Sequence, residues 1–192
     1  MKKTEIREFF DRLAPRWDET TVRNEKVIEY ILDCGGIRAG AHVLDVACGT
    51  GVLFPDYFAR NVGSLTAVDI SPEMVKLAKE KYPEADVICG DAEKTAFSRD
   101  FDAIMVYNAF PHFPSPEGLV SALCSHLKRG GRLTVAHGMS RRALEEHHSG
   151  SAAAVSIDLL PENELAAIFG KYLEVDTVIS DEEKYIVSGV LR

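Results

Sequence analysis

Residues 42–54 read HVLDVACGTGVLF, and this stretch decides the fold. A short apolar run that contains Asp45 meets a tight Cys48-Gly49-Thr50-Gly51 corner, and apolar residues then return. A run of this kind is typical of a buried strand. Glycines directly after a strand allow positive φ angles and a close approach of the backbone to a ligand. In open α/β sheets, ligands bind where a strand turns into the next helix, so we expect a ligand beside this corner.

The same alternation of short apolar runs and helically spaced segments continues along the chain. Strands are predicted at 42–46, 65–69, 86–89, 102–107 and 132–136. Helices are predicted at 52–60, 72–82, 92–97 and 116–128. Strands that alternate with helices in this way indicate a parallel sheet with helices on both faces.

The two ends of the chain follow other patterns. Residues 4–17 and 22–36 have helical spacing, and Pro15 is expected to end or kink the first helix. A further helix follows Pro161, and residues 174–192 read as two strands joined by the polar segment 180–184, which predicts a hairpin.

Length and charge favour one domain over residues 1–192 and a small-molecule partner. The chain is 46% hydrophobic with a formal net charge of −8, and such a surface repels DNA and RNA. No apolar run reaches the roughly 18 residues of a membrane span, and the first residues lack the apolar core of a secretory signal. The four cysteines form no C-x-x-C pair, which favours buried thiols in a reducing cytoplasm.

Two further acids extend the motif at the corner. Asp69 ends the second predicted strand, 20 residues after Gly49, at the distance where an acid meets a ribose diol. Phe54 stands where a dinucleotide motif has its third glycine, so a nucleoside is better supported than a pyrophosphate. Each residue alone also has a structural explanation, because an acid at a helix N-terminus is favoured by the helix dipole.

With these residues in view, the chain resembles the class I S-adenosylmethionine-dependent methyltransferases. The resemblance rests on segments in the family's order, namely VLDVACGTG (43–51), AVDIS (67–71), CGDAEKTAF (89–97), FDAIMVYNAF (101–110) and LKRGGRLTVA (127–136). The leader FFDRLAPRWDE (9–19) is similar to that of the ubiquinone- and menaquinone-biosynthesis type. The resemblance implies a Rossmann-like, seven-stranded, mostly parallel sheet with an antiparallel C-terminal hairpin strand.

The resemblance also implies a role for each residue that matches the family's motifs. Gly49 and Gly51 would lie against the methionine part of S-adenosylmethionine, and Asp45 would reach its ammonium group. Ala47 and Cys48 stand where many relatives have glycine and would leave less room.

At the nucleoside end, the resemblance places Asp69 on the two ribose hydroxyls and Ile70 on adenine. Asp91 would accept a hydrogen bond from the adenine amino group, and the Ala92 N–H would face the ring. Asn108 would lie beside the sulfonium, and Trp17 would belong to a lid.

The acceptor side is suggested by residues that follow the fourth and fifth predicted strands. His137 is our first candidate for a catalytic base and His112 the second, because both follow strands whose ends meet at one cleft. Arg141, His147 and His148 complete the candidate acceptor contacts, although the last two are equally explained as surface residues near a helix C-terminus. The separations of the histidines match no standard zinc signature, so no metal is predicted.

The sequence therefore predicts methyl transfer from S-adenosylmethionine to a small molecule. Residues 1–35 would form a helical lid, and residues 138–160 an insertion on the acceptor side. A nicotinamide-dependent oxidoreductase and a non-catalytic S-adenosylmethionine-binding protein are the alternatives. The acceptor, the methylated atom and the oligomeric state are left open at this stage.

Overall fold

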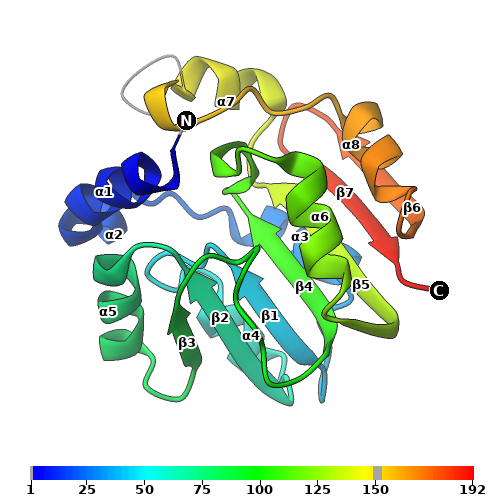
Figure 1. The fold of residues 1–192 in the computed structure, drawn as a ribbon, viewed down its shortest axis with the longest axis horizontal. Coiled ribbons are helices and arrows are strands. Elements are labelled where there is room, and N and C mark those ends of the chain that lie inside the picture. Colours follow the sequence, from blue (N-terminus) through cyan, green and yellow to red (C-terminus); the bar gives the residue numbers. More distant parts are fainter. Residues whose placement is uncertain (1, 149–152) are drawn as a thin grey trace.

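A single seven-stranded sheet organises the molecule (Figure 1). The computed structural model describes residues 2–148 and 153–192, with the backbone alone for residues 145–148 and 153. The strands are β1 (His42–Val46), β2 (Ser64–Asp69), β3 (Asp86–Cys89), β4 (Phe101–Tyr107), β5 (Leu127–His137), β6 (Glu174–Ser180) and β7 (Tyr185–Val190).

The order across the sheet is β3-β2-β1-β4-β5-β7-β6. The first five strands pair in parallel, and β7 runs antiparallel to both of its neighbours, β5 and β6. This confirms the predicted Rossmann-like sheet, including the antiparallel strand supplied by the C-terminal hairpin.

Helices cover both faces of the sheet (Figure 1). One apolar cluster joins the sheet to α3 (Glu25–Cys34), α4 (Phe54–Ala59) and α5 (Pro72–Lys81), and a second joins it to α6 (Pro116–Cys124) and α8 (Glu162–Phe169). The remaining helices are α1 (Lys3–Leu13), η1 (Ala14–Arg16), α2 (Trp17–Thr20), η2 (Phe110–His112), α7 (Arg141–His148) and η3 (Ala153–Val155). Pro15 lies in η1, where the first predicted helix ends.

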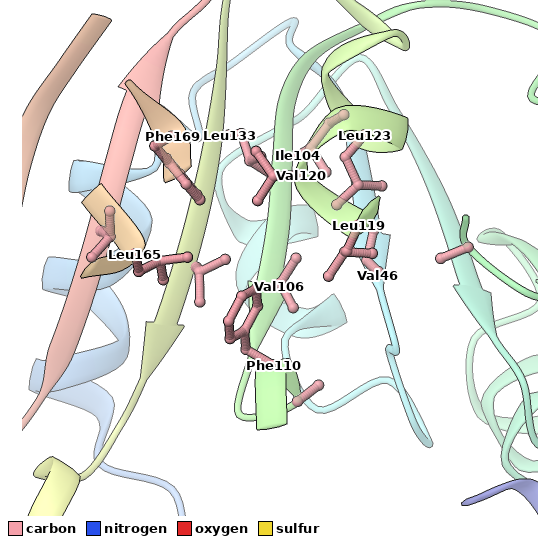
Figure 2. Close-up of a cluster of buried hydrophobic side chains, with 14 of the residues drawn as sticks. Val46, Ile104, Val106, Phe110, Leu119, Val120, Leu123, Leu133, Leu165 and Phe169 are labelled. Atoms are coloured by element: carbon pink, nitrogen blue, oxygen red, sulfur yellow. The ribbon is translucent and has the colours of Figure 1, made fainter. Parts of the chain in front are cut away.

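Strand β4 contributes to both clusters because successive side chains of a strand point to opposite faces. Ile104 and Val106 lie in one cluster with Leu119 of α6 and with residues of α8 (Figure 2), whereas Met105 and Tyr107 belong to the opposite cluster. Burial of each such large apolar side chain stabilises the fold by about 1.5–3 kcal/mol. The alternation also brings Tyr107 to the sheet edge on the side of α3 and α4.

Helix α5 begins where the sequence predicts. The Ser71 side chain accepts a hydrogen bond from the Met74 N–H at 3.1 Å, and Pro72 occupies the first helical position. This cap satisfies one of the otherwise unpaired N–H groups of the first turn. It also fixes the chain immediately after Asp69.

Two predicted boundaries are wrong. Residues 92–97 form no helix, because the N–H groups of Lys94 and Thr95 bond to the Asp91 carbonyl in one turn that does not continue. Helix α6 ends at Cys124 rather than at residue 128, and β5 starts at Leu127. Gly130, with a φ of +76°, lies where the pairing of β4 and β5 shifts register, which local apolar periodicity does not predict.

Within the described part of the chain, no helix combines the length and the apolar character needed to cross a membrane.

Candidate cofactor and acceptor site

A pocket opens at the C-terminal edge of β1, β2 and β4, beneath the N-terminal helices. It has about 990 Å³ of empty space, counting its open mouth. The lining comes from the glycine corner, the ends of β2, β3 and β4, helix α1, and the segment that follows β4.

The corner between β1 and α4 has the left-handed backbone that the sequence predicts. Ala47, Gly49 and Gly51 have φ angles of +55°, +55° and +88°. Ala47, Cys48 and Gly49 line the pocket. An alanine at positive φ is strained by about 1–2 kcal/mol, and backbone strain of this kind is concentrated at functional sites.

Gly51 has a different reason to be glycine. It is absent from the lining among the described residues, and a Cβ there would lie 2.8 Å from Phe54 Cδ2 and 3.0 Å from Tyr82 Cδ2. The chain's own aromatic packing therefore excludes a side chain at this position, whatever ligand is bound.

Asp69 is fixed at the end of β2 by two backbone donors. Its Oδ2 accepts from the Gly49 N–H at 2.8 Å, and its Oδ1 accepts from the Ser71 N–H at 2.9 Å. The carboxylate lines the pocket, and each oxygen has a further lone pair available for a ligand hydroxyl. Burial raises the pKa of Asp69 to about 6, although the bonds from Ser71 and Gly49 lower it.

This pKa predicts weaker cofactor binding in acid. Because burial raises the pKa, the carboxylate is ionised above about pH 6 and protonated below it, where it loses acceptor capacity. Affinity for S-adenosylhomocysteine should fall about tenfold between pH 7.5 and pH 5, in proportion to the ionised fraction. Calorimetry across this range measures the effect. Asp69→Asn cannot titrate at this position, so its affinity should not show this fall between pH 7.5 and pH 5. An equal loss of affinity in acid for both proteins would contradict a role of the Asp69 carboxylate in cofactor binding.

Asp45 lies beneath the corner rather than in the lining. Among the described residues, neither its Oδ2 nor the Tyr57 hydroxyl has a hydrogen-bond partner. Burial raises the pKa of Asp45 to about 8, while the neighbouring Tyr57 hydroxyl lowers it and the charge of Asp69 raises it further. A buried polar atom normally has a partner, so this carboxyl fits a role toward the cofactor's ammonium group, through a bridging water.

The end of β3 forms another wall of the pocket. Gly90, Asp91 and Ala92 line it. Asp91 and Ala92 are the two residues that the resemblance assigns to adenine, and Gly90 was not predicted. Lys3 of α1 lines the pocket too, and its Nζ lies 2.8 Å from both carboxylate oxygens of Asp91. Sequence reasoning missed Lys3, since nothing local connects it with residues so far along the chain.

The N-terminal helices bring aromatic residues over the pocket. Trp17 lines it, and its Nε1 lies 3.6 Å from the place of a Cβ on Gly49. The Phe10 ring packs edge-on against Trp17, with ring centroids 5.7 Å apart. It also packs edge-on against the His112 ring, with centroids 4.8 Å apart. One aromatic chain therefore connects the glycine corner with the segment that follows β4.

His112, on η2, is the candidate base that the structure places in the pocket. Its Nδ1 lies 2.9 Å from the Val155 carbonyl and 3.2 Å from Ser156 Oγ. Because a carbonyl can only accept, this contact assigns the ring proton to Nδ1 and makes Nε2 the basic nitrogen.

His137 does not reach the pocket. It is fully buried, is absent from the lining among the described residues, and meets the Tyr185 ring at 6.0 Å. The reason is that β5 continues through His137 and pairs it with Tyr185 of β7, so the residue lies within the sheet rather than beyond its edge.

The other acceptor candidates come from α7. Arg141 is also missing from the lining among the described residues. The side chains of His147 and His148 lie outside the described part of the chain.

Asn108 lines the pocket in a strained conformation. Its φ is +53°, and its Oδ1 accepts from the Gly138 N–H at 2.9 Å. A Cβ at Gly138 would lie 2.4 Å from the Tyr107 hydroxyl, so a larger residue there would displace the Tyr107 side chain. The ends of β4 and β5 are thus fixed against each other beside the pocket.

Several apolar or aromatic lining residues were not predicted as site residues. They are Ile6, Phe10, Val22, Val52, Val68, Met74, Tyr107, Ala109, Phe113 and Pro114. Their apolar character alone predicts only core, and Tyr107, next to Asn108, had the clearest positional signal. Among the described residues, no three His, Cys, Asp or Glu side chains come together in a way that could hold a metal ion.

The residues present fit S-adenosylmethionine. Backbone approach is possible at Gly49, two anchored oxygens are available on Asp69, and an acid closes the adenine end. The dinucleotide alternative is not favoured, because the position of the third glycine is filled by Phe54, whose side chain is fully buried.

Comparison with known proteins agrees with this geometry. Residues 44–135 match the methyltransferase domain family. The chain is 30% identical to a demethylmenaquinone methyltransferase of Renibacterium salmoninarum over 138 residues, covering 69% of this chain and 58% of the relative. It is 38% identical to a ubiquinone biosynthesis O-methyltransferase of Xanthomonas axonopodis over 101 residues, covering 50% of this chain and 42% of the relative. The chain thus spans about half the length of these curated relatives.

A solved structure shows the same fold over the whole chain. The magnesium protoporphyrin IX methyltransferase of Synechocystis, determined with bound S-adenosylhomocysteine, aligns with a TM-score of 0.74 at 17% identity, covering 100% of both chains. The family match and the sheet order together confirm the resemblance drawn from the sequence. Residues 44–135 therefore carry a methyltransferase domain, and S-adenosylmethionine is the cofactor that this domain indicates.

Proposed function

We propose that this protein transfers a methyl group from S-adenosylmethionine to a small, uncharged and largely apolar acceptor that carries a hydroxyl group. The observation that supports this most directly is the division of the pocket into two unlike parts. One part holds the glycine corner and the acids, and the other is lined by aromatic and aliphatic side chains together with His112.

The charge distribution supports an uncharged acceptor. Within the described lining, the side chains of Lys, Arg, Asp and Glu are Lys3, Asp69 and Asp91. All three lie at the end assigned to the nucleoside, where Lys3 and Asp91 pair with each other. Among the described lining residues, an acceptor with a fixed charge would find no charged partner on the side of Phe113 and Pro114, and burying an unpaired charge is costly.

S-adenosylmethionine, when bound, supplies a methyl group that is already activated on its sulfonium sulfur. The chain's own contribution is then alignment and exclusion of water. Trp17 and Phe10 cover the pocket, and Asn108 is held rigidly at its floor. His112 Nε2 would take the hydroxyl proton as the oxygen forms its bond to carbon.

The names of the relatives support an acceptor of this kind. One is named for demethylmenaquinone and the other for ubiquinone biosynthesis. The proposal also includes a cytoplasmic location, supported by four cysteines that are all free thiols, and no nucleic-acid partner, supported by the net charge of −8.

The test of this function is the His112→Ala variant. Transfer to a hydroxyl acceptor should fall by roughly 10²–10⁴, the range of general acid–base groups, while affinity for S-adenosylhomocysteine stays within about twofold. Turnover is measured as the formation of S-adenosylhomocysteine from S-adenosylmethionine in the presence of each member of a panel of apolar phenols, amines and carboxylic acids. His137→Ala is the matched control, because its side chain lies outside the lining.

Other outcomes would identify the alternatives. Cofactor binding without turnover on any acceptor of the panel would indicate a non-catalytic binding protein. Preferential turnover of amines, or normal turnover by His112→Ala, would contradict the hydroxyl acceptor and the base.

A further inference from the structure

Helix α1 is fastened to the adenine end of the pocket by one cation. Lys3 Nζ contacts both carboxylate oxygens of Asp91 at 2.8 Å and also pairs with Glu93. These partners lie 88 and 90 residues further along the chain. The ion pair therefore crosses from the cover of the pocket to its wall.

The environment of this ion pair keeps it intact but open to solvent. Partial burial lowers the pKa of Lys3, but the hydrogen bonds to Asp91 and Glu93 outweigh this effect, so the net pKa is raised and the amine is charged at neutral pH. The Lys3 side chain is 32% exposed, and those of Asp91 and Glu93 are 19% and 14% exposed. Water and salt can therefore reach the pair.

The rest of α1 is held weakly by apolar contacts. Ile6 is the buried residue of this helix, and Phe10 is only partly buried. The other ties are polar and lie further along the N-terminal segment: Ser71 Oγ donates to Asp11 of α1 at 2.6 Å, while Thr50 Oγ1 and Lys81 Nζ donate to Asp18 of α2 at 2.5 and 2.7 Å. A segment with few buried apolar contacts opens at low free energy, so these polar ties largely determine how long it stays closed.

We propose that Lys3 is a positioning residue that latches α1 over the adenine end of the cofactor site, and that its ion pair with Asp91 and Glu93 opens each time the cofactor exchanges. The proposal rests on the proposed function only in requiring that S-adenosylmethionine and its product bind in this pocket. Because α1 also carries Ile6 and Phe10, the latch links occupancy of the adenine end to the wall of the acceptor pocket.

The decisive measurement is the rate at which S-adenosylhomocysteine leaves the protein, followed by stopped-flow displacement. Lys3→Met should release the product roughly fivefold faster than wild type, the effect of losing one partly exposed ion pair. Raising salt from about 50 mM to about 500 mM should accelerate release from wild type, because the pair is screened, and should have little effect on Lys3→Met.

Matched variants separate the latch from a general loss of charge. Arg7→Gln removes a cation from the exposed side of the same helix and should release product at the wild-type rate. Glu93→Gln removes a partner that is not among the described lining residues and should accelerate release, and combining it with Lys3→Met should add little. Amide hydrogen exchange in α1 should be faster in Lys3→Met than in wild type, by the same factor as the release of the product.

Two results would overturn the proposal, and they differ in what else they imply. Unchanged release and unchanged salt dependence in Lys3→Met, with normal product binding, would refute the latch alone. If wild-type protein binds no S-adenosylhomocysteine, both the latch and the proposed function fail.

Discussion

Asp69→Ala is expected to weaken binding of S-adenosylhomocysteine by at least about 100-fold. The substitution removes the acceptors for two ribose hydroxyls, and charge-assisted hydrogen bonds of this kind contribute about 1.5–3 kcal/mol each. It also removes the anchor of the Gly49 N–H, whose bond to Oδ2 is 2.8 Å long, so the corner itself should loosen. Titration calorimetry at pH 7.5 gives the affinity directly.

A matched control keeps this result specific. Glu73→Ala removes an exposed acid from the first turn of α5, close to Asp69 in the sequence, and should bind product normally. Circular dichroism and a melting curve establish that Asp69→Ala is folded. A folded Asp69→Ala protein with affinity near that of wild type would remove Asp69 from the cofactor site.

Gly51→Val should lower the free energy of unfolding by about 2–4 kcal/mol, the second large effect. Two causes add here: a β-branched residue is a steric outlier at a φ of +88°, and its Cβ would lie 2.8 Å from Phe54 Cδ2. The Phe54 and Tyr82 rings already pack edge to face with centroids 5.4 Å apart, so neither can move without loss of contact. Urea denaturation measures the change.

Gly40 provides the control for this variant. Its φ is +77°, yet nothing lies within 4 Å of the position where a Cβ would be. Gly40→Val therefore carries the backbone strain without the clash and should destabilise by only about 1–2 kcal/mol. If the two variants lose equal stability, packing against Phe54 is not the reason for glycine at position 51.

The sequence alone determined the local features of this protein. Short apolar runs gave the strands because a strand buried on both faces needs nearly continuous apolar residues. The cap at Ser71, the corner at Gly49 and the acid 20 residues later at Asp69 were predictable because each depends on neighbours in the chain or on the repeating geometry of one strand-helix-strand unit. Those units fix the cofactor side of the pocket.

Tertiary structure alone decided the acceptor side and the cover. The sequence ranks His137 ahead of His112 as the candidate base, but β7 inserts beside β5 and pairs with His137, whereas Val155 and Ser156 orient His112 from 43 and 44 residues away. Lys3 meets Asp91 across 88 residues. Such contacts have no local periodicity, because they depend on which surfaces pack together once the sheet has formed.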